Sequence, residues 1–454
     1  MSTVGAMVTA VILVALLIVD VLLPSRPAGP ARGRRGDDRT VSATRPARPA
    51  PATTVPPRPV WRVAWGSAMA WGFGTASDAT VRDLATVGVG GTAIRIRISN
   101  VFGNEPLVIG AASVGFDAAG AAVVPGTLHQ LLFSGKRGVT MPVGGFVYSD
   151  PVAMAVTDMR VLAVSIFVRK ADLVTVHPCC TNIVSYFTPN GGGNLTGSLT
   201  GSGLTTSSPW ERWVDAVDVL QRTGRGSIVV IGDSITDGFN ATLRWTTVLQ
   251  QRIDTLPAAE QRAVVNEGIT ANALTSVVHT DSAIGGGPSG LSRLGRDAID
   301  QAGVSEVVLF LGTNDLWFGA TGEQLIAGYR DAIADVRERG LRIVAVTLLP
   351  RFSSPQERWT AFQQAEMEHV NRWILTSGSF DGVLNLAAAV ADVYNGACDP
   401  DRLFAAYDSG DHLHPDAAGL VAMADAIDPA VLGLPALPRV PRRAEVTPTP
   451  GCRG

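Results

Sequence analysis

Hydrophobic and polar residues follow two different periodic patterns along this chain, and the pattern changes about halfway. In residues 60–222 the period is two, as in Thr92–Ile98, where apolar and charged residues take turns. Such alternation is typical of a strand with one buried face. A second strand is expected at Val161–Val168, and turn segments such as Pro189–Gly193 separate the strands. This pattern predicts an all-β sandwich or jelly roll.

In residues 226–436 apolar strands alternate with amphipathic helices. Strands are expected at Ser227–Ile231, Val307–Leu311 and Ile343–Leu348. Between the last two, apolar residues recur on one face of an expected helix, namely Ile326, Tyr329, Ile333 and Val336. Continuous apolar strands separated by helices are typical of a parallel sheet that is covered on both faces. The expected fold class is therefore α/β, with a parallel sheet flanked by helices and preceded by the β-rich domain.

The two ends of the chain differ in composition from its middle. Residues 1–23 contain a nearly unbroken apolar run, long enough to cross a hydrocarbon core of about 30 Å. They are expected to be a signal peptide or membrane anchor, although the arginines follow the run instead of preceding it. Residues 24–59 are expected to be a disordered Pro-rich linker, and residues 437–454 a loose tail. The predicted location is therefore extracellular, or anchored at the outer face of the cell membrane.

Composition excludes some classes of function. With 46% hydrophobic and 17% charged residues, the 454-residue chain can build a sizeable core. Its formal net charge of -3 argues against nucleic-acid binding, for which a basic surface stripe is the usual sign. None of the cysteines has a zinc-binding spacing, so no structural metal is expected. Cys179 and Cys180 are expected to be separate thiols or partners for Cys398, not a strained vicinal bridge.

The candidate chemistry lies in the polar segments that follow the strands, because ligand sites of parallel sheets lie beyond the carboxyl ends of the strands. Gly232–Gly238 follows the first strand and places Ser234 in a tight turn before a helix, where it is a candidate nucleophile. The segment departs from the Gly-x-Ser-x-Gly elbow, because Thr236 stands at the second glycine. Taken alone, Ser234 is equally well explained as an N-cap residue.

Two further segments contain candidate hydrogen-bond donors. Gly268 follows a short strand expected at Ala263–Asn266, and Asn314 lies in the segment Gly312–Asp315. A glycine N–H and an asparagine amide, aimed at one point, can stabilise an oxyanion. Taken singly, each is also an ordinary turn residue.

The last candidate segment precedes the final expected helix and contains Asp411 and His414, three residues apart. At this spacing a carboxylate can orient an imidazole, which then serves as the general base that a serine hydroxyl needs. The rival hypotheses are a plain Asp-capped turn and a metal site made of Asp408, Asp411, His412 and His414. No other cluster of ligands appears in the sequence, so a metal is not expected.

Together these segments resemble those of the GDSL, or SGNH, hydrolase superfamily. The four matching blocks are Gly232–Ile235, Asn266–Gly268, Gly312–Asp315 and Asp411–His414, within about residues 227–429. The resemblance implies a flavodoxin-like SGNH fold and a serine esterase. A β domain followed by such a hydrolase domain is also similar to a group of exported actinobacterial SGNH esterases.

By this resemblance Ser234 is the nucleophile, His414 the base and Asp411 the acid that orients it. The oxyanion hole consists of the Ser234 and Gly268 N–H groups and the Asn314 side chain. The family needs no metal or organic cofactor.

Two residues depart from the family pattern. Ile235 replaces the usual leucine, which is a conservative change. Ala271 stands where a second glycine often follows the glycine of the second block, which leaves the geometry of that loop open.

The predicted function is a serine ester hydrolase that acts through an acyl-enzyme, with an acetylated carbohydrate or another small ester as the expected substrate. A lipase, a short-chain carboxylesterase or an acyltransferase would use the same residues. A hypothesis of another class makes the β domain a carbohydrate-binding module with an inactive hydrolase domain. Trp61, Trp65 and Trp71 could stack on sugars there, although core positions are commoner for tryptophan.

The expected partners follow from these predictions. They are an ester substrate, such as an acetylated polysaccharide or a lipid, and no nucleic acid. Contact with a membrane is expected only through the N-terminal segment.

Overall fold

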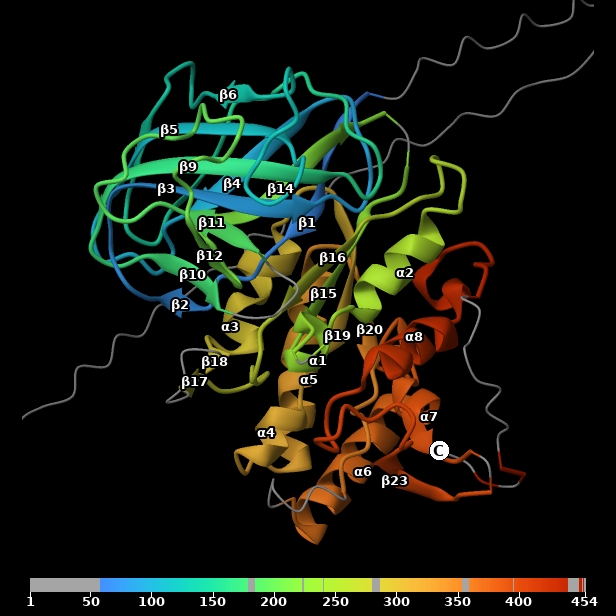
Figure 1. Cartoon of the computed structure of the whole chain (residues 1–454). Coiled ribbons are helices and arrows are strands. Elements are labelled where there is room, and N and C mark those ends of the chain that lie inside the picture. Colours follow the sequence, from blue (N-terminus) through green and yellow to red (C-terminus); the bar gives the residue numbers. More distant parts are fainter. Residues whose placement is uncertain are drawn as a thin grey trace, which may run out of the picture. The chain divides into compact units, whose positions relative to one another are not determined.

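The computed structural model describes residues 58–178, 184–222, 224–239, 241–279, 286–352, 359–394, 396–439, 449–450 and 452 (Figure 1). Pro56–Gly454 form one compact unit. The expected signal or anchor lies outside the described residues, as does the expected linker up to residue 57. Within the described part of the chain, no helix combines the length and the apolar character needed to cross a membrane.

The N-terminal β-rich domain contains two main antiparallel sheets and a small one (Figure 1). In spatial order, the first sheet consists of β1 (Val60–Gly66), β14 (Val214–Gln221), β4 (Ile94–Ser99) and β8 (Phe146–Tyr148). The second consists of β12 (Thr206–Ser208), β11 (Ser185–Phe187), β3 (Ala76–Thr86), β9 (Val161–Ala171), β5 (Leu107–Phe116) and β6 (His129–Leu131), with β7 (Val139–Met141) also paired to β5. The small sheet consists of β13 (Trp210–Arg212), β10 (Thr175–Pro178) and β2 (Trp71–Gly72).

The predicted period of two explains how these sheets pack. Ile94, Ile96 and Ile98 of β4 are fully buried, and they share one hydrophobic cluster with Val164 and Ile166 of β9. Side chains of the two main sheets therefore meet in a common core, as expected for a sandwich.

The C-terminal half is built on a five-stranded parallel sheet with helices beside it (Figure 1). Its strands are, in spatial order, β16 (Val264–Gly268), β15 (Ser227–Gly232), β19 (Val304–Phe310), β20 (Arg342–Val346) and β21 (Gly382–Leu384). The helices are α1 (Ser234–Asp237), α2 (Trp245–Ile253), α3 (Gly290–Leu294), α4 (Thr313–Trp317), α5 (Gly322–Glu338), α6 (Ala361–Thr376), α7 (Leu386–Val390) and α8 (Ala417–Ala426). A π-helical turn η1 (Gly295–Ile299), a 3-10 turn η2 (Pro429–Leu432) and two short strand pairs complete it, β17 (Val278–His279) with β18 (Gly286–Gly287) and β22 (Ala391–Asp392) with β23 (Asp399–Leu403).

The parallel sheet is buried on both faces, as the apolar strands predict. Successive residues of a strand point to opposite faces. Val229 and Ile231 of β15 pack in one cluster with residues of α3, α5 and α6, whereas Ile228 and Val230 pack in a second cluster with residues of α2, α7 and α8. The four apolar residues predicted on one face of α5 are all buried in the first cluster.

The two halves of the chain share a core. The cluster on the α5 face of the parallel sheet also includes Ile96 and Val217 of the β-rich domain. At the edge of this contact, the Ser227 hydroxyl donates to the carbonyl oxygen of Val63 at 2.7 Å. The regions expected to be separate domains are therefore packed directly on each other among the described residues.

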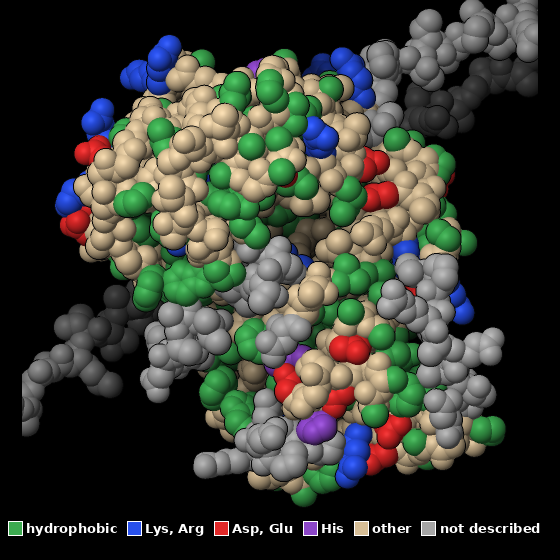
Figure 2. Space-filling view, in the orientation of Figure 1, with side chains coloured by type: hydrophobic (Ala, Val, Ile, Leu, Met, Phe, Trp, Pro, Cys, Tyr) green, Lys and Arg blue, Asp and Glu red, His purple; other side chains and the backbone are tan. Residues whose placement is uncertain are grey.

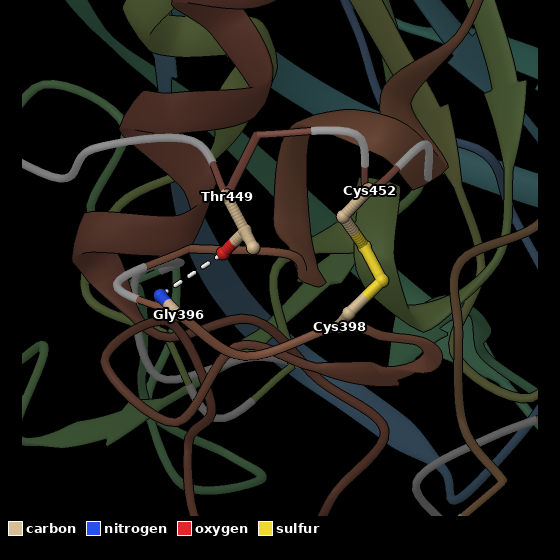
Figure 3. The surroundings of a disulfide bond; sticks show 4 residues. All are labelled: Gly396, Cys398, Thr449 and Cys452. Atoms are coloured by element: carbon tan, nitrogen blue, oxygen red, sulfur yellow. Dashed lines mark hydrogen bonds between the residues drawn. A yellow bond between two sulfur atoms is a disulfide. The ribbon is translucent and has the colours of Figure 1, made fainter.

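The end of the chain is attached to the C-terminal half by a disulfide between Cys398 and Cys452 (Figure 3). Beside it, the Gly396 N–H donates to Thr449 Oγ1 at 3.0 Å. The expected tail is thus held near its end, which differs from the loose tail that its Pro-rich composition predicts.

This disulfide corrects one prediction. Pairing of Cys398 with Cys179 or Cys180 is wrong, because the Cys398 sulfur is bonded to Cys452. Cys179 and Cys180 themselves lie outside the described residues.

Charged side chains are unevenly distributed over the face shown in Figure 2. Lys and Arg side chains are scattered there, mainly around the β-rich domain, and the described residues of this face form no continuous basic stripe. Asp, Glu and His side chains gather over the C-terminal half.

Candidate active site

Ser234 lies at the junction of β15 and α1. Strand β15 ends at Gly232, and Asp233 alone connects it to the helix. Asp233 is the N-cap, and its Oδ1 accepts from the Ile235 N–H at 3.0 Å. The alternative in which Ser234 is the N-cap is therefore wrong. As the first residue of α1, Ser234 has a backbone N–H without a partner inside the helix.

His414 contacts both of the other residues predicted for the triad. Its Nε2 lies 2.8 Å from Ser234 Oγ, and its Nδ1 lies 2.6 Å from Asp411 Oδ2. An ionised carboxylate only accepts hydrogen bonds, so Nδ1 carries the hydrogen and Nε2 accepts from the serine hydroxyl. Ser234 and His414 are each 7% exposed. This is the arrangement of a Ser–His–Asp triad.

Asp411 fixes the turn as well as the imidazole. Its Oδ1 accepts from the Leu413 N–H at 3.0 Å and from the His414 N–H at 2.8 Å. Burial by itself raises the pKa of Asp411, but the hydrogen bonds and charge of His414 and the two N–H groups outweigh it, so the pKa is below its usual value. The carboxylate is therefore ionised at neutral pH, and the capped turn and the triad are one structure.

The rival metal hypothesis needs the two aspartates and two histidines of this turn around one ion. In the structure they form two separate Asp–His pairs instead. Asp408 Oδ2 lies 2.5 Å from His412 Nδ1, while Asp411 pairs with His414. Among the residues with described positions, no group of three His, Cys, Asp or Glu side chains is arranged to hold a metal ion. The geometry therefore favours the triad over the metal site.

Asn314 approaches the site from the end of β19. Gly312 has a φ of 136°, and a Cβ there would lie 2.7 Å from the Tyr329 hydroxyl, so the turn into α4 requires glycine. The Asn314 amide donates one hydrogen to the Asn272 carbonyl oxygen at 2.9 Å. No acceptor among the described residues takes its second amide hydrogen, which is left for another acceptor.

Asp315 ties the same helix to the loop that follows β16. Its carboxylate accepts from the Leu274 N–H at 2.7 Å and from the Thr275 N–H at 2.8 Å. Asn314 and Asp315 therefore both contact this loop, the first with a donor and the second with acceptors.

Gly268 lies at the end of β16, but its N–H is not free. It donates to Asn266 Oδ1 at 3.0 Å. Glycine is needed there for another reason, since a Cβ would lie 2.4 Å from the backbone nitrogen of Asp237. The oxyanion role that the resemblance implies for Gly268 is thus contradicted by the geometry, because the side chain of Asn266 folds back onto this N–H.

The loop after β16 presents another N–H. Ala271 has a φ of 60°, in the left-handed region where residues other than glycine are uncommon. Among the described residues, the Ala271 N–H has no hydrogen-bond acceptor. It lies directly before Asn272, which accepts from Asn314. This conformation explains why a glycine was expected at this position.

Arg293 of α3 was not among the residues that the sequence pattern identified. It is 1% exposed, and its guanidinium donates to the Gly232 carbonyl at 3.0 Å, the Glu267 carbonyl at 2.7 Å and Asn272 Oδ1 at 3.1 Å. One side chain therefore joins the ends of β15 and β16 to the residue that contacts Asn314. An arginine in a short helix carries no sequence signal for such a role.

One protein family matches the C-terminal half of the chain. Residues 230–420, which include the whole triad, match the GDSL-like lipase/acylhydrolase family. Curated protein sequences give no match. Similar solved structures include the aryl esterase of M. smegmatis, with 19% identity, a TM-score of 0.35 and coverage of 46% of this chain and 100% of that one.

Two further structures are similar to the same extent. One is a GDSL-like lipase from Bacteroides thetaiotaomicron, with 17% identity, a TM-score of 0.34 and coverage of 46% of this chain and 88% of that one. The other is LAE5, an alpha/beta hydrolase enzyme from the metagenome of Lake Arreo, with 18% identity, a TM-score of 0.34 and coverage of 47% and 98%. The match of residues 230–420 to the GDSL-like lipase/acylhydrolase family supports a GDSL-type serine esterase.

Proposed function

We propose that the chain hydrolyses short acyl esters, in the first place acetyl groups on a carbohydrate, through an acyl-enzyme on Ser234. The observation that carries the mechanism is the position of His414, which is hydrogen-bonded to Ser234 at 2.8 Å and to Asp411 at 2.6 Å. A serine hydroxyl is a weak nucleophile until such a base takes its proton.

In the first half of the reaction, Ser234 Oγ attacks the ester carbonyl carbon while its proton passes to His414 Nε2. The imidazolium then gives this proton to the departing alcohol as the C–O bond breaks, which leaves the acyl-enzyme. In the second half, a water molecule loses a proton to the same nitrogen and attacks the acyl group. The acid is released, and Ser234 regains its hydrogen.

Negative charge on the tetrahedral oxygen needs preorganised donors. The Ser234 N–H and the second amide hydrogen of Asn314 are available for it. We assign the third donor to the Ala271 N–H in place of Gly268, since Gly268 already donates to Asn266. Each such donor is worth about 10²–10³ in rate.

A carbohydrate substrate outside the cell requires that the chain is exported. The apolar N-terminal run and Pro-rich segment favour export, and so does the disulfide between Cys398 and Cys452, because disulfides persist mainly in oxidising compartments. The alternative binding-module hypothesis gains little from the tryptophans. Trp65 and Trp71 pack against the core, and the Arg95 guanidinium lies 4.9 Å from the Trp61 ring centre.

The test is hydrolysis of p-nitrophenyl esters, from acetate to palmitate, by the full chain and by Ser234→Ala and His414→Ala. We expect the highest rate on acetate and a loss of at least about 10⁴-fold in each variant, with folding unchanged. Acetate release from acetylated xylan, measured next, tests the carbohydrate. A rate that peaks on long chains would support the lipase alternative. A folded protein without a serine-dependent rate on any ester would overturn the proposed function.

A further inference from the structure

His177, in β10 of the β-rich domain, lies against the helix that begins with the nucleophile. It is 2% exposed, and its two ring nitrogens contact Ala68 O at 2.7 Å and Asp237 Oδ1 at 3.3 Å. A carbonyl oxygen only accepts, so Nδ1 carries a hydrogen. The bond to the Asp237 carboxylate requires a second hydrogen on Nε2. The pair is therefore an imidazolium bound to a carboxylate.

The charged groups around His177 come from three other segments, and the two carboxylates among them stabilise its cation. Asp237 belongs to α1 and Glu211 to β13, while Arg244, just before α2, lies 3.7 Å from the Asp237 carboxylate. Burial by itself lowers the pKa of His177, but the charges of Asp237 and Glu211 outweigh it, so the pKa is raised. His177 and Asp237 therefore attract each other across the contact between the two halves of the chain.

The other oxygen of Asp237 holds the loop that follows β16. Asp237 Oδ2 accepts from the Thr270 N–H at 2.9 Å and from the Thr270 hydroxyl at 2.8 Å. Thr270 directly precedes Ala271, and Asn272 accepts from Asn314. One carboxylate therefore connects a cation of the β-rich domain to the loop beside the nucleophile.

Apolar contacts between the same two segments support this connection. Ala68 and Ala70 of the β-rich domain form a small buried cluster with Ile269, the residue before Thr270. Between the two alanines, the Met69 carbonyl accepts from the Arg296 guanidinium at 2.7 Å. The β-rich domain therefore contacts the loop directly as well as through Asp237.

We propose that His177 is a positioning residue of the esterase, which holds Asp237 and thereby the Ile269–Asn272 loop and its oxyanion donor. The β-rich domain is then a part of the catalytic apparatus and not a separable binding module. This inference rests on the proposed function, because the loop matters only if an oxyanion forms at Ser234.

Two substitutions at one position separate the contacts of the imidazole. His177→Asn keeps a donor toward Ala68 O and removes both the charge and the reach to Asp237. His177→Gln places an amide nitrogen where Nε2 lies and restores a donor to Asp237. With p-nitrophenyl acetate we expect kcat to fall about 10–100-fold in His177→Asn, less than for complete loss of a donor, with KM nearly unchanged. His177→Gln should regain most of that loss.

A double-mutant cycle tests whether His177 acts through Asp237. If it does, His177→Asn combined with Asp237→Asn has the kcat of the worse single variant. Multiplied losses would show independent effects and would overturn the proposal.

Val164→Ala is the matched control for stability, because Val164 is fully buried in the core of the β-rich domain, on the strand β9 that pairs with β3 and β5. It should lower Tm and leave kcat unchanged at a temperature well below the transition. An equal fall of kcat in this control would assign the His177 effect to general destabilisation and would overturn the proposal.

If His177→Asn does not fold, Thr270→Val tests the other side of the carboxylate. It removes the hydroxyl bond to Asp237, and we expect a lower kcat at unchanged KM. Full activity in folded Thr270→Val would contradict the inference. A wild-type chain without serine-dependent hydrolysis would refute the proposed function itself, whereas an active wild type with a fully active, folded His177→Asn would refute only the role of His177.

Discussion

The acid of the triad can be removed without removing the turn that it caps. In Asp411→Asn, the amide oxygen can replace Oδ1 as the acceptor for the Leu413 and His414 N–H groups. The amide nitrogen replaces Oδ2 and cannot accept from His414 Nδ1. The imidazole then loses the partner that keeps Nε2 free to accept the proton of Ser234.

The size of the effect follows from the contact that is lost. A hydrogen bond to a charged group contributes about 1.5–3 kcal/mol, which corresponds to about 10–150-fold in rate. The Asp411 side chain is 32% exposed, so water replaces part of the carboxylate. We therefore expect kcat to fall about 10²-fold, far less than for Ser234→Ala. KM should hardly change, because the carboxylate faces the imidazole and its own turn.

The assay is the burst and steady-state release of p-nitrophenol from the acetate ester, with Tm measured in parallel. Asp408→Asn is the matched control, since Asp408 forms a similar pair with His412 at 2.5 Å in the same loop. Its kcat should stay within about threefold of wild type. A folded Asp411→Asn within threefold of wild type, or an equal loss in Asp408→Asn, would refute the role assigned to Asp411.

Three further predictions concern the surroundings of the site. Arg293→Lys keeps the charge but cannot serve three acceptors at once, so Tm and kcat should both fall, kcat about tenfold; unchanged ester hydrolysis would contradict its role. Replacing both Cys398 and Cys452 by serine opens a loop with a sequence separation of 54 and should reduce the free energy of unfolding by about 4 kcal/mol. This loss corresponds to a Tm lower by about 5 °C, and kcat should stay unchanged. Burial, and to a smaller extent the charge of Glu211, raises the pKa of Asp83 to about 8. Between about pH 4 and pH 8 the folded chain therefore keeps a proton on Asp83 that the unfolded chain loses. The free energy of unfolding thus falls as the pH rises through this range. The Tm of Asp83→Asn relative to wild type should therefore rise from pH 5 to pH 9, and a constant difference would contradict this.

The parts of the structure that the sequence predicts well depend on local patterns. The apolar residues of β15 and the buried face of α5 follow from periodicity, because burial on one or both faces dictates which positions are apolar. Asp411 and His414 were predictable for a similar reason, since three residues bring the carboxylate within 2.6 Å of the imidazole on one turn. Only the contact of His414 with Ser234, across a separation of 180 residues, depended on the fold.

The residues that hold the site in place could not be predicted, because the groups that they contact are distant from them in the sequence. Arg293 contacts Gly232 across 61 residues, and His177 contacts Asp237 across 60. An isolated arginine or histidine carries no mark of such a contact. The disulfide partner of Cys398 was equally open, because spacing does not decide connectivity.

The role implied for Gly268 failed for a more local reason. A motif places a residue at the site, but it does not determine which way an N–H points. At the end of β16 the Asn266 side chain takes the Gly268 N–H and is itself fixed by donating to the carbonyl oxygen of Thr236 at 2.6 Å. The glycine is needed for close packing against α1, a requirement that a motif cannot distinguish from a donor role.

The left-handed conformation of Ala271 follows from the number of contacts that fix its neighbours. For a residue with a Cβ this conformation costs roughly 1–2 kcal/mol, and such strain persists only where the surroundings over-determine the backbone. Thr270 is bound by Asp237, and Asn272 is bound by both Asn314 and Arg293. These contacts come from three different helices, so Ala271 cannot relax without breaking buried hydrogen bonds on one side or the other. These hydrogen bonds therefore keep the strained loop, and the N–H that it presents, in one conformation before any substrate binds.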